Sequence, residues 1–138
     1  MPLDKVRIRF CKSGDLRLVS HHDLMRTWER MLRRAQLPFR MTEGFHPTPR
    51  LIFALSLSLG IVGKNEVVEL ELTEELPPEE VLSRLTAQAP HGLHFLHIKR
   101  IPIKVTARPR RAFFRVHTSE LLQERGYDAG QWNAKCQA

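Results

Sequence analysis

Cysteine is scarce in this sequence, which removes several protein classes at once. Of the 138 residues only Cys11 and Cys136 are cysteines, and they lie far apart in the chain. Two unclustered cysteines exclude a disulfide-stapled scaffold and supply no ligand set for a structural zinc ion or an iron–sulfur cluster. Their small number favours a reducing compartment, and we expect a cytoplasmic protein.

Long hydrophobic runs are also missing. The longest apolar stretch, Leu51 to Val62, is interrupted by Ser56, Ser58 and Gly60, so we expect no membrane span. Because charged residues interrupt positions 4–9, we expect no secretory signal at the N-terminus. The sequence contains neither a glycine-rich phosphate loop nor a serine nucleophile motif. We therefore expect no cofactor, and we favour a protein that is not an enzyme.

Positive charge is abundant and unevenly distributed. The chain has 22 Lys and Arg against 15 Asp and Glu, a net charge of +7. Residues 1–60 carry a net charge of +6, residues 61–90 carry −5, and residues 91–138 carry +6. Such a sequence is expected to present a basic face, which favours a polyanionic partner. Nucleic acid is the first candidate, ahead of a membrane surface.

The N-terminal segment predicts a half-buried strand. Apolar and polar residues alternate over residues 5–11, and this alternation places Arg7 and Arg9 on the face opposite the apolar side chains. Residues 13–15 have the composition of a turn, and residues 16–19 are expected to be a short extended return.

A basic amphipathic helix should follow. Ser20 is the expected N-cap, and Asp23 three residues later resembles a capping box with a short acid. An apolar stripe at helical spacing then continues to about Gln36, just before a proline. Four arginines fall on the outer face or beside it: Arg26, Arg30, Arg33 and Arg34.

The remaining pattern completes an α+β domain. Gly44 and two prolines constrain a loop over residues 43–50, and the acidic start and apolar stripe of residues 76–89 predict a second helix. Further strands are expected at residues 39–42, 51–59, 66–73 and 93–98, of which 51–59 and 66–73 form an antiparallel hairpin. This order is the split βαβ plan of a ferredoxin-like sandwich, with two helices on one face of an antiparallel sheet.

The domain organisation has two parts. Residues 1–103 form the ferredoxin-like domain, and residues 104–138 form a basic linker and C-terminal extension, the start of a truncated second domain. A strand over residues 112–116 and a helix over residues 119–125 are expected within it. Because the extension is too short for its own core, it is expected to dock on the main domain, pair with a second copy as a homodimer, or stay mobile.

Several motifs between residues 5 and 100 resemble a known family. The sequence contains R-I-R-F-x-K-x-G-x-L-R-L-V-S-H-x-D-L-M-R-x-x-E-R-x-L-R-R-A and then G-F-x-P-x-P-R-L-x-F-A-L-S-L-x-L-G. This pattern is similar to the radical SAM-linked family, a bacterial domain of unknown function fused to or encoded beside radical SAM proteins. The resemblance implies an accessory role near RNA or ribosome chemistry, with a radical SAM protein as partner. The chain lacks the Cys-x₃-Cys-x₂-Cys motif, so it cannot itself hold a radical SAM cluster.

The basic residues are the main candidate for a binding site. Arginine binds phosphate in a bidentate manner, and Phe45 with His46 offers a stacking surface for an unpaired base. The predicted nucleic-acid-binding residues are Arg7, Arg9, Lys12, Arg26, Arg30, Arg33, Arg34 and Arg50. The residues expected to support the helix start and the loop are Ser20, His21, Asp23, Gly44, Phe45, Pro47 and Pro49.

The histidines support only an alternative. His21 and His22 are adjacent on a helix, about 100° apart, so they do not converge on one metal ion. His94 and His97 are expected on opposite faces of a strand, so we predict no metal site. The leading hypothesis is a non-catalytic accessory domain that binds RNA or a ribosome-related particle for a radical SAM partner. The alternatives are a metal-independent endoribonuclease using His21 and His46 as acid and base, and a protein-docking module.

Overall fold

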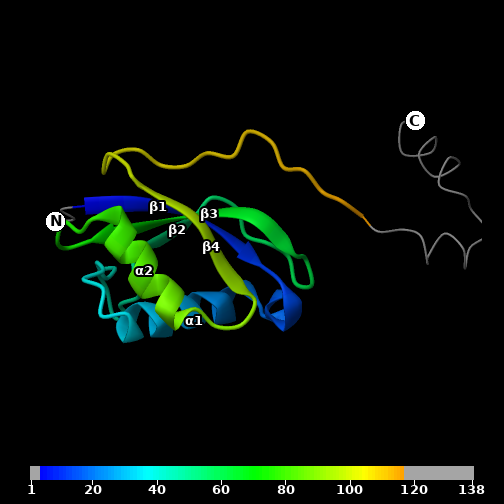
Figure 1. The fold of residues 1–138 in the computed structure, drawn as a ribbon, viewed down its shortest axis with the longest axis horizontal. Coiled ribbons are helices and arrows are strands. Elements are labelled where there is room, and N and C mark those ends of the chain that lie inside the picture. Colours follow the sequence, from blue (N-terminus) through cyan, green and yellow to red (C-terminus); the bar gives the residue numbers. More distant parts are fainter. Residues whose placement is uncertain (1–3, 117–138) are drawn as a thin grey trace, which may run out of the picture.

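Strand β1 is a central strand of a four-stranded antiparallel sheet in the computed structural model, which describes residues 4–116 (Figure 1). The strand order is β2-β3-β1-β4, and both helices cover the same face of the sheet. This arrangement confirms the predicted ferredoxin-like α+β fold. The elements are β1 (Asp4–Lys12), a 3₁₀ helix η1 (Gly14–Leu18), α1 (His21–Arg34), β2 (Leu51–Phe53), β3 (Gly63–Leu72), α2 (Pro78–Gln88) and β4 (Leu93–Arg100).

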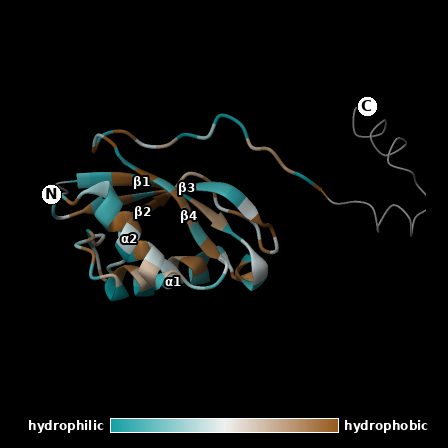
Figure 2. Cartoon of the chain, in the orientation of Figure 1, coloured by the Kyte–Doolittle hydropathy of each residue, from teal (hydrophilic) through white to brown (hydrophobic). Residues whose placement is uncertain are grey.

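The core is organised around a buried tryptophan. Trp28 of α1 packs edge-on against Phe10, Phe53 and Phe95, with ring centroids 5.4, 6.0 and 5.7 Å away. These rings come from three strands, and edge-to-face aromatic pairs add to the stabilisation from buried area. Hydrophobic residues lie along the strands and on the sides of the helices that meet them (Figure 2). One tryptophan therefore joins α1 to three of the four strands.

The first helix begins and ends with local sequence signals. Ser20 Oγ accepts a hydrogen bond from the Asp23 N–H at 3.2 Å, and the Ser20 hydroxyl donates to the Asp23 carboxylate at 3.0 Å. The predicted N-cap is thus confirmed, although Asp23 binds the hydroxyl and not the backbone. At the other end Gln36 adopts a φ of 52°, and Leu37 N–H donates to Leu32 O at 3.3 Å. This is a Schellman ending, which stops the helix just before Pro38.

Two predicted extended segments are wrong. The strand expected over residues 51–59 ends at Phe53, because Gly60 N–H donates to Arg17 O at 2.7 Å and holds residues 54–62 as a loop against η1. Residues 16–19 were expected to be extended, but most of this segment lies in the 3₁₀ helix η1. Gly14, with a φ of 59°, turns the chain at the start of that helix.

Other minor strands also differ from expectation. Residues 39–42 form only isolated bridges, Phe39 with Leu72 and Met41 with Pro49. No strand forms over the predicted residues 112–116. The helix predicted over residues 119–125 lies outside the described residues. Within residues 4–116, no helix has the length and hydrophobicity needed to cross a membrane.

The helix-free face of the sheet is centred on a buried carboxylate. Glu69 is 0% exposed, although it pairs with Arg7 on the face of the sheet that no helix covers. Its Oε2 lies 2.9 Å from Lys5 Nζ, and its Oε1 accepts hydrogen bonds from Arg7 Nη2 and from the Ala107 N–H, each at 2.7 Å. Lys5 Nζ also donates to Val105 O at 2.7 Å. Residues 101–107, which we call the strap, are thereby held across this face (Figure 1).

These contacts decide the ionisation of Glu69. Burial raises the pKa of its carboxyl, but hydrogen bonds from Lys5, Arg7 and the Ala107 N–H outweigh burial and hold the pKa below the usual glutamate value. The carboxylate is therefore the favoured form in the folded protein. Its contribution to stability is present above the unfolded-state pKa and is lost as pH falls through the lower folded-state pKa.

Removal of this carboxylate should destabilise the fold. We expect Glu69→Ala to lower the free energy of unfolding by about 3–5 kcal/mol at pH 7, because it leaves the buried Lys5 ammonium without its counter-ion. Urea denaturation measures this loss, and Glu74→Ala, at an exposed position, is the matched control. The difference from wild type should shrink as pH falls through the folded-state pKa of Glu69. A difference below 1 kcal/mol at pH 7 would contradict the structural role of the cluster.

Candidate nucleic-acid interface

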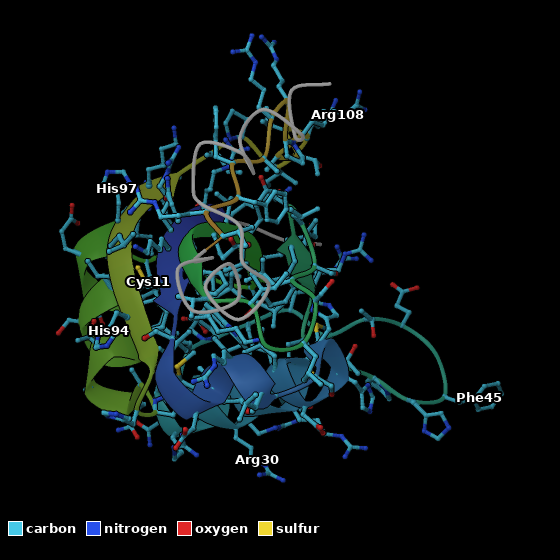
Figure 3. All side chains as sticks on the ribbon, turned by 90° about the vertical axis from the view of Figure 1, so that its right-hand side faces the viewer. Cys11, Arg30, Phe45, His94, His97 and Arg108 are labelled. Atoms are coloured by element: carbon cyan, nitrogen blue, oxygen red, sulfur yellow. The ribbon has the colours of Figure 1, made fainter. Side chains whose placement is uncertain are left out.

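The sheet divides the predicted basic residues into two sets. Arg7 and Arg9 of β1 lie on the helix-free face, whereas the arginines of α1 lie on the opposite side of the molecule. Figure 3 shows this separation, with Arg30 below the sheet and Arg108, beyond the strap, above it. The residues predicted from the sequence therefore do not form a single surface.

The strand and loop arginines are mostly held by buried acids. Arg7 donates to Glu69 through Nε at 3.0 Å and Nη2 at 2.7 Å. Arg50 Nε lies 3.9 Å from Glu71, which also accepts a hydrogen bond from Arg40 Nη1 at 2.9 Å. Arg9 is exposed and donates to Asn65 Oδ1 at 3.2 Å. Of the predicted residues on this side, only Arg9 keeps its guanidinium clear of carboxylates within residues 4–116.

Lys12 lies inside the domain. Its side chain is buried on the helix-covered side of β1, where Nζ donates to Val19 O at 3.1 Å. Burial lowers the pKa of the Lys12 ammonium, and the Glu66 carboxylate acts in the opposite direction. The pKa of Glu66 is raised by its own burial, against the attraction of Lys12. Lys12 is thus not placed to meet a phosphate.

The outer side of α1 carries the accessible arginines. We call Arg26, Arg30, Arg33 and Arg34 the helix surface. Arg26 lies 3.9 Å from Asp23, and Arg33 Nη2 lies 2.9 Å from Glu29. Arg34 Nη2 donates to Gln88 O at 3.4 Å, and no ion pair forms at Arg30 among the described residues. Such exposed ion pairs contribute about 0–1 kcal/mol, so a phosphate can replace them readily.

A small hairpin projects from the sheet edge between α1 and β2. Thr42 N–H donates to Thr48 O at 2.7 Å, and Thr48 N–H donates to Thr42 Oγ1 at 3.0 Å. Gly44 turns the tip with a φ of 125°, and Phe45 beside it is 100% exposed. Figure 3 shows Phe45 at the far end of this projection. The predicted loop therefore presents an aromatic side chain on a hydrogen-bonded base.

The two candidate catalytic histidines lie in different places. His21 packs edge-on against Phe53 in the body of the domain, with ring centroids 5.1 Å apart. His46 follows Phe45 at the tip of the projecting hairpin. His21 thus supports β2 and not the hairpin, and the fold does not bring the two imidazoles together.

A β-bulge changes the placement of the other histidines. The pairing of β1 with β4 shifts between Arg9 and Phe10, so that Leu96 becomes the extra residue on β4. His94 then pairs with Cys11 and His97 with Arg9, which places both histidines on the helix-free face. Our prediction that they point to opposite faces is wrong because of this bulge. Within residues 4–116, no three His, Cys, Asp or Glu side chains form a group that could hold a metal ion.

Sequence comparison assigns the chain to a family. A family model described as an uncharacterized protein conserved in bacteria, DUF2344, matches residues 5–138. The chain belongs to the DUF2344 family. No match was found among curated proteins. The DUF2344 match includes the helix surface, the hairpin and the strap, so all three lie within the family region.

Sequence reasoning missed a second basic segment of this DUF2344 chain. Residues 108–116, which we call the arm, follow the strap and are exposed throughout. The arm contains four arginines and two adjacent phenylalanines: Arg108, Arg110, Arg111, Arg115, Phe113 and Phe114. Interleaved arginines and aromatics are typical of segments that bind single-stranded nucleic acid. The pattern is visible in the sequence, where the composition of the segment alone indicates a basic linker.

The buried lysine of this DUF2344 chain gives a test of the site geometry. In the folded protein the Lys12 ammonium should titrate below the ordinary lysine pKa, because burial disfavours its charged form. Glu66→Gln should lower the Lys12 pKa further, since it removes the carboxylate that favours the ammonium. NMR of ¹³C-labelled lysine side chains against pH measures both. An ordinary Lys12 pKa, or no response to Glu66→Gln, would contradict the buried placement.

Proposed function

We propose that this chain is a non-catalytic accessory domain that binds RNA, or an RNA-containing particle, through the helix surface. The observation that supports it is the charge of α1, which carries four arginines and two acids. Arg30, with no ion pair among the described residues, lies between Arg26 and Arg33 at helical spacing. Planar guanidinium groups match the geometry of phosphate oxygens and bind them in pairs.

The helix-free face is a weaker candidate for RNA. RNA-binding domains with a four-stranded sheet stack bases on aromatic residues of the open face. Here Phe10 and Phe95 pack against Trp28 under the helices. The centre of the open face is instead occupied by Glu69 and the strap. The strap covers the centre of this face, and Arg7 is held by Glu69, which leaves the helix surface as the better site.

The proposal includes a radical SAM protein as the partner of this domain. The resemblance to the radical SAM-linked family suggests that this domain serves a radical SAM protein in the bacterial cytoplasm. The chain has two distant cysteines, so the iron–sulfur cluster of such a pair would belong to the partner. The domain would contribute RNA binding and positioning, and the partner would carry the reaction.

Charge reversal on α1 tests the proposal directly. We expect Arg26→Glu/Arg30→Glu/Arg33→Glu to weaken binding to single-stranded and structured RNA at least about tenfold, because three phosphate contacts are lost. The slope of log affinity against log salt should become shallower by about 2, at roughly 0.7 for each contact with a single strand. Fluorescence anisotropy at several salt concentrations measures both quantities.

The arm provides a control of equal charge. Arg108→Glu/Arg110→Glu/Arg111→Glu changes the net charge by the same amount on the opposite side of the sheet. This variant should lose much less affinity than the α1 variant. Equal losses would mean that RNA responds only to net charge or contacts the arm as well, and either result would contradict the helix surface as the main contact. Unchanged binding by the α1 variant would refute the helix surface altogether.

A further inference from the structure

Sequence pattern and structure disagree most clearly in the segment after β2. Apolar residues alternate with others from Leu51 to Leu59, and no charged residue occurs from Leu51 to Gly63. Such a pattern is typical of a strand, yet β2 ends at Phe53 and residues 54–62 form a loop. A segment with strong strand character that is not a strand in the isolated chain often lies at a functional site.

The loop leaves large apolar side chains in solvent. Leu55 is 42% exposed, Leu59 is 64% exposed, and Val62 is also exposed. The hydrogen bond from Gly60 N–H to Arg17 O brings this loop against η1, whose last residue, Leu18, is exposed as well. Clustered exposed apolar residues mark interaction surfaces. Three of these side chains belong to the segment that directly follows β2, and the fourth belongs to η1, against which that segment is held.

The two edges of the sheet are protected differently. The β4 edge contains a bulge at Leu96 and the charged residues Lys99 and Arg100, which are common devices against edge-to-edge pairing. The β2 edge and the segment that continues it contain no charge, no proline and no bulge. Only β3 pairs with β2 among the described residues. The β2 edge is therefore open to another strand.

The charge of the chain indicates which molecule supplies the strand that pairs with the β2 edge. An acidic protein or RNA would be drawn to the arginine-rich helix surface and arm, and would gain no ion pair at an uncharged edge. Two copies with a net charge of +7 each repel one another over most of their surface. The uncharged stretch from Leu51 to Gly63 is where two copies can meet without placing like charges together. An antiparallel pair of identical edges is also self-complementary about a two-fold axis.

We propose that two copies of this chain associate through their β2 edges. In the dimer, residues 54–59 give up the loop conformation that they have in the single chain. They continue β2 and pair antiparallel with the same segment of the second copy, so that the two sheets become one. Backbone hydrogen bonds fix the pairing, and Leu55 and Leu59 lose their exposure to water against the other copy. This surface is separate from the helix surface, so the dimer forms with or without RNA.

Sedimentation equilibrium of the chain in the absence of RNA tests the dimer. The wild type should show a reversible monomer–dimer equilibrium. Leu55→Lys/Leu59→Lys should raise the dissociation constant at least about tenfold, because it places charge at the apolar contact. Leu96→Lys is the matched control, since Leu96 is 52% exposed on the opposite edge strand, and it should dimerise like the wild type.

A backbone variant separates strand pairing from hydrophobic contact. Ala54 N–H donates to Val67 O of β3, so in a continued strand the N–H groups of Leu55 and Leu57 point away from β3 toward the second copy. Leu57 N–H makes no backbone hydrogen bond in the described residues, so Leu57→Pro should leave the fold intact, as circular dichroism would show. The proline variant should nevertheless raise the dissociation constant of the dimer at least about tenfold, because proline cannot donate a backbone hydrogen bond to the strand of the second copy. A wild type that stays monomeric at every concentration, or an equal effect of Leu96→Lys, would overturn the proposal. Neither result depends on RNA binding.

Discussion

The buried carboxylate of Glu69 is the constraint on which the arrangement of charge in this protein depends. A fully buried carboxylate must be paired to be tolerated, and here Lys5, Arg7 and the Ala107 N–H supply the partners. The same requirement draws the strap back over the sheet, because Lys5 also binds Val105 O. One acid therefore ties the C-terminal segment to the first strand.

The buried acids of the sheet determine which arginines remain available to bind phosphate. Arg7 is held by Glu69, and Arg40 and Arg50 lie against Glu71 on the same side. The basic character of β1, evident in the sequence, is largely neutralised inside the domain. On α1 Asp23 is exposed and Glu29 is partly exposed, and the ion pairs they form with exposed arginines are weak. The difference between the two faces is one of burial and not of composition.

Local signals predicted much of the fold. The Ser20 cap, the apolar stripe of α1 and the alternation of β1 each depend on residues close in sequence, and each was confirmed. The order of strands and helices along the chain was then enough to predict the ferredoxin-like topology. These features need no knowledge of distant contacts.

The errors came from contacts between distant residues. The length of β2 depends on the hydrogen bond between Gly60 and Arg17, and the placement of His97 depends on a bulge in the pairing with β1. The burial of Glu69 depends on the strap, about 40 residues later in the chain. The candidate site was therefore only partly predictable, since sequence patterns identify basic residues but not which of them meet a buried acid.

We propose that RNA binds the accessible basic surface of α1 and not the sheet. The most direct measurement is an NMR titration of the ¹⁵N-labelled chain with a short single-stranded RNA, in which backbone amides and arginine Nε–H groups are followed. We expect the largest chemical-shift changes at Arg26, Arg30 and Arg33. Changes concentrated at Arg7, Glu69 and the strap would contradict this placement, because they would show RNA entering the face that the strap covers.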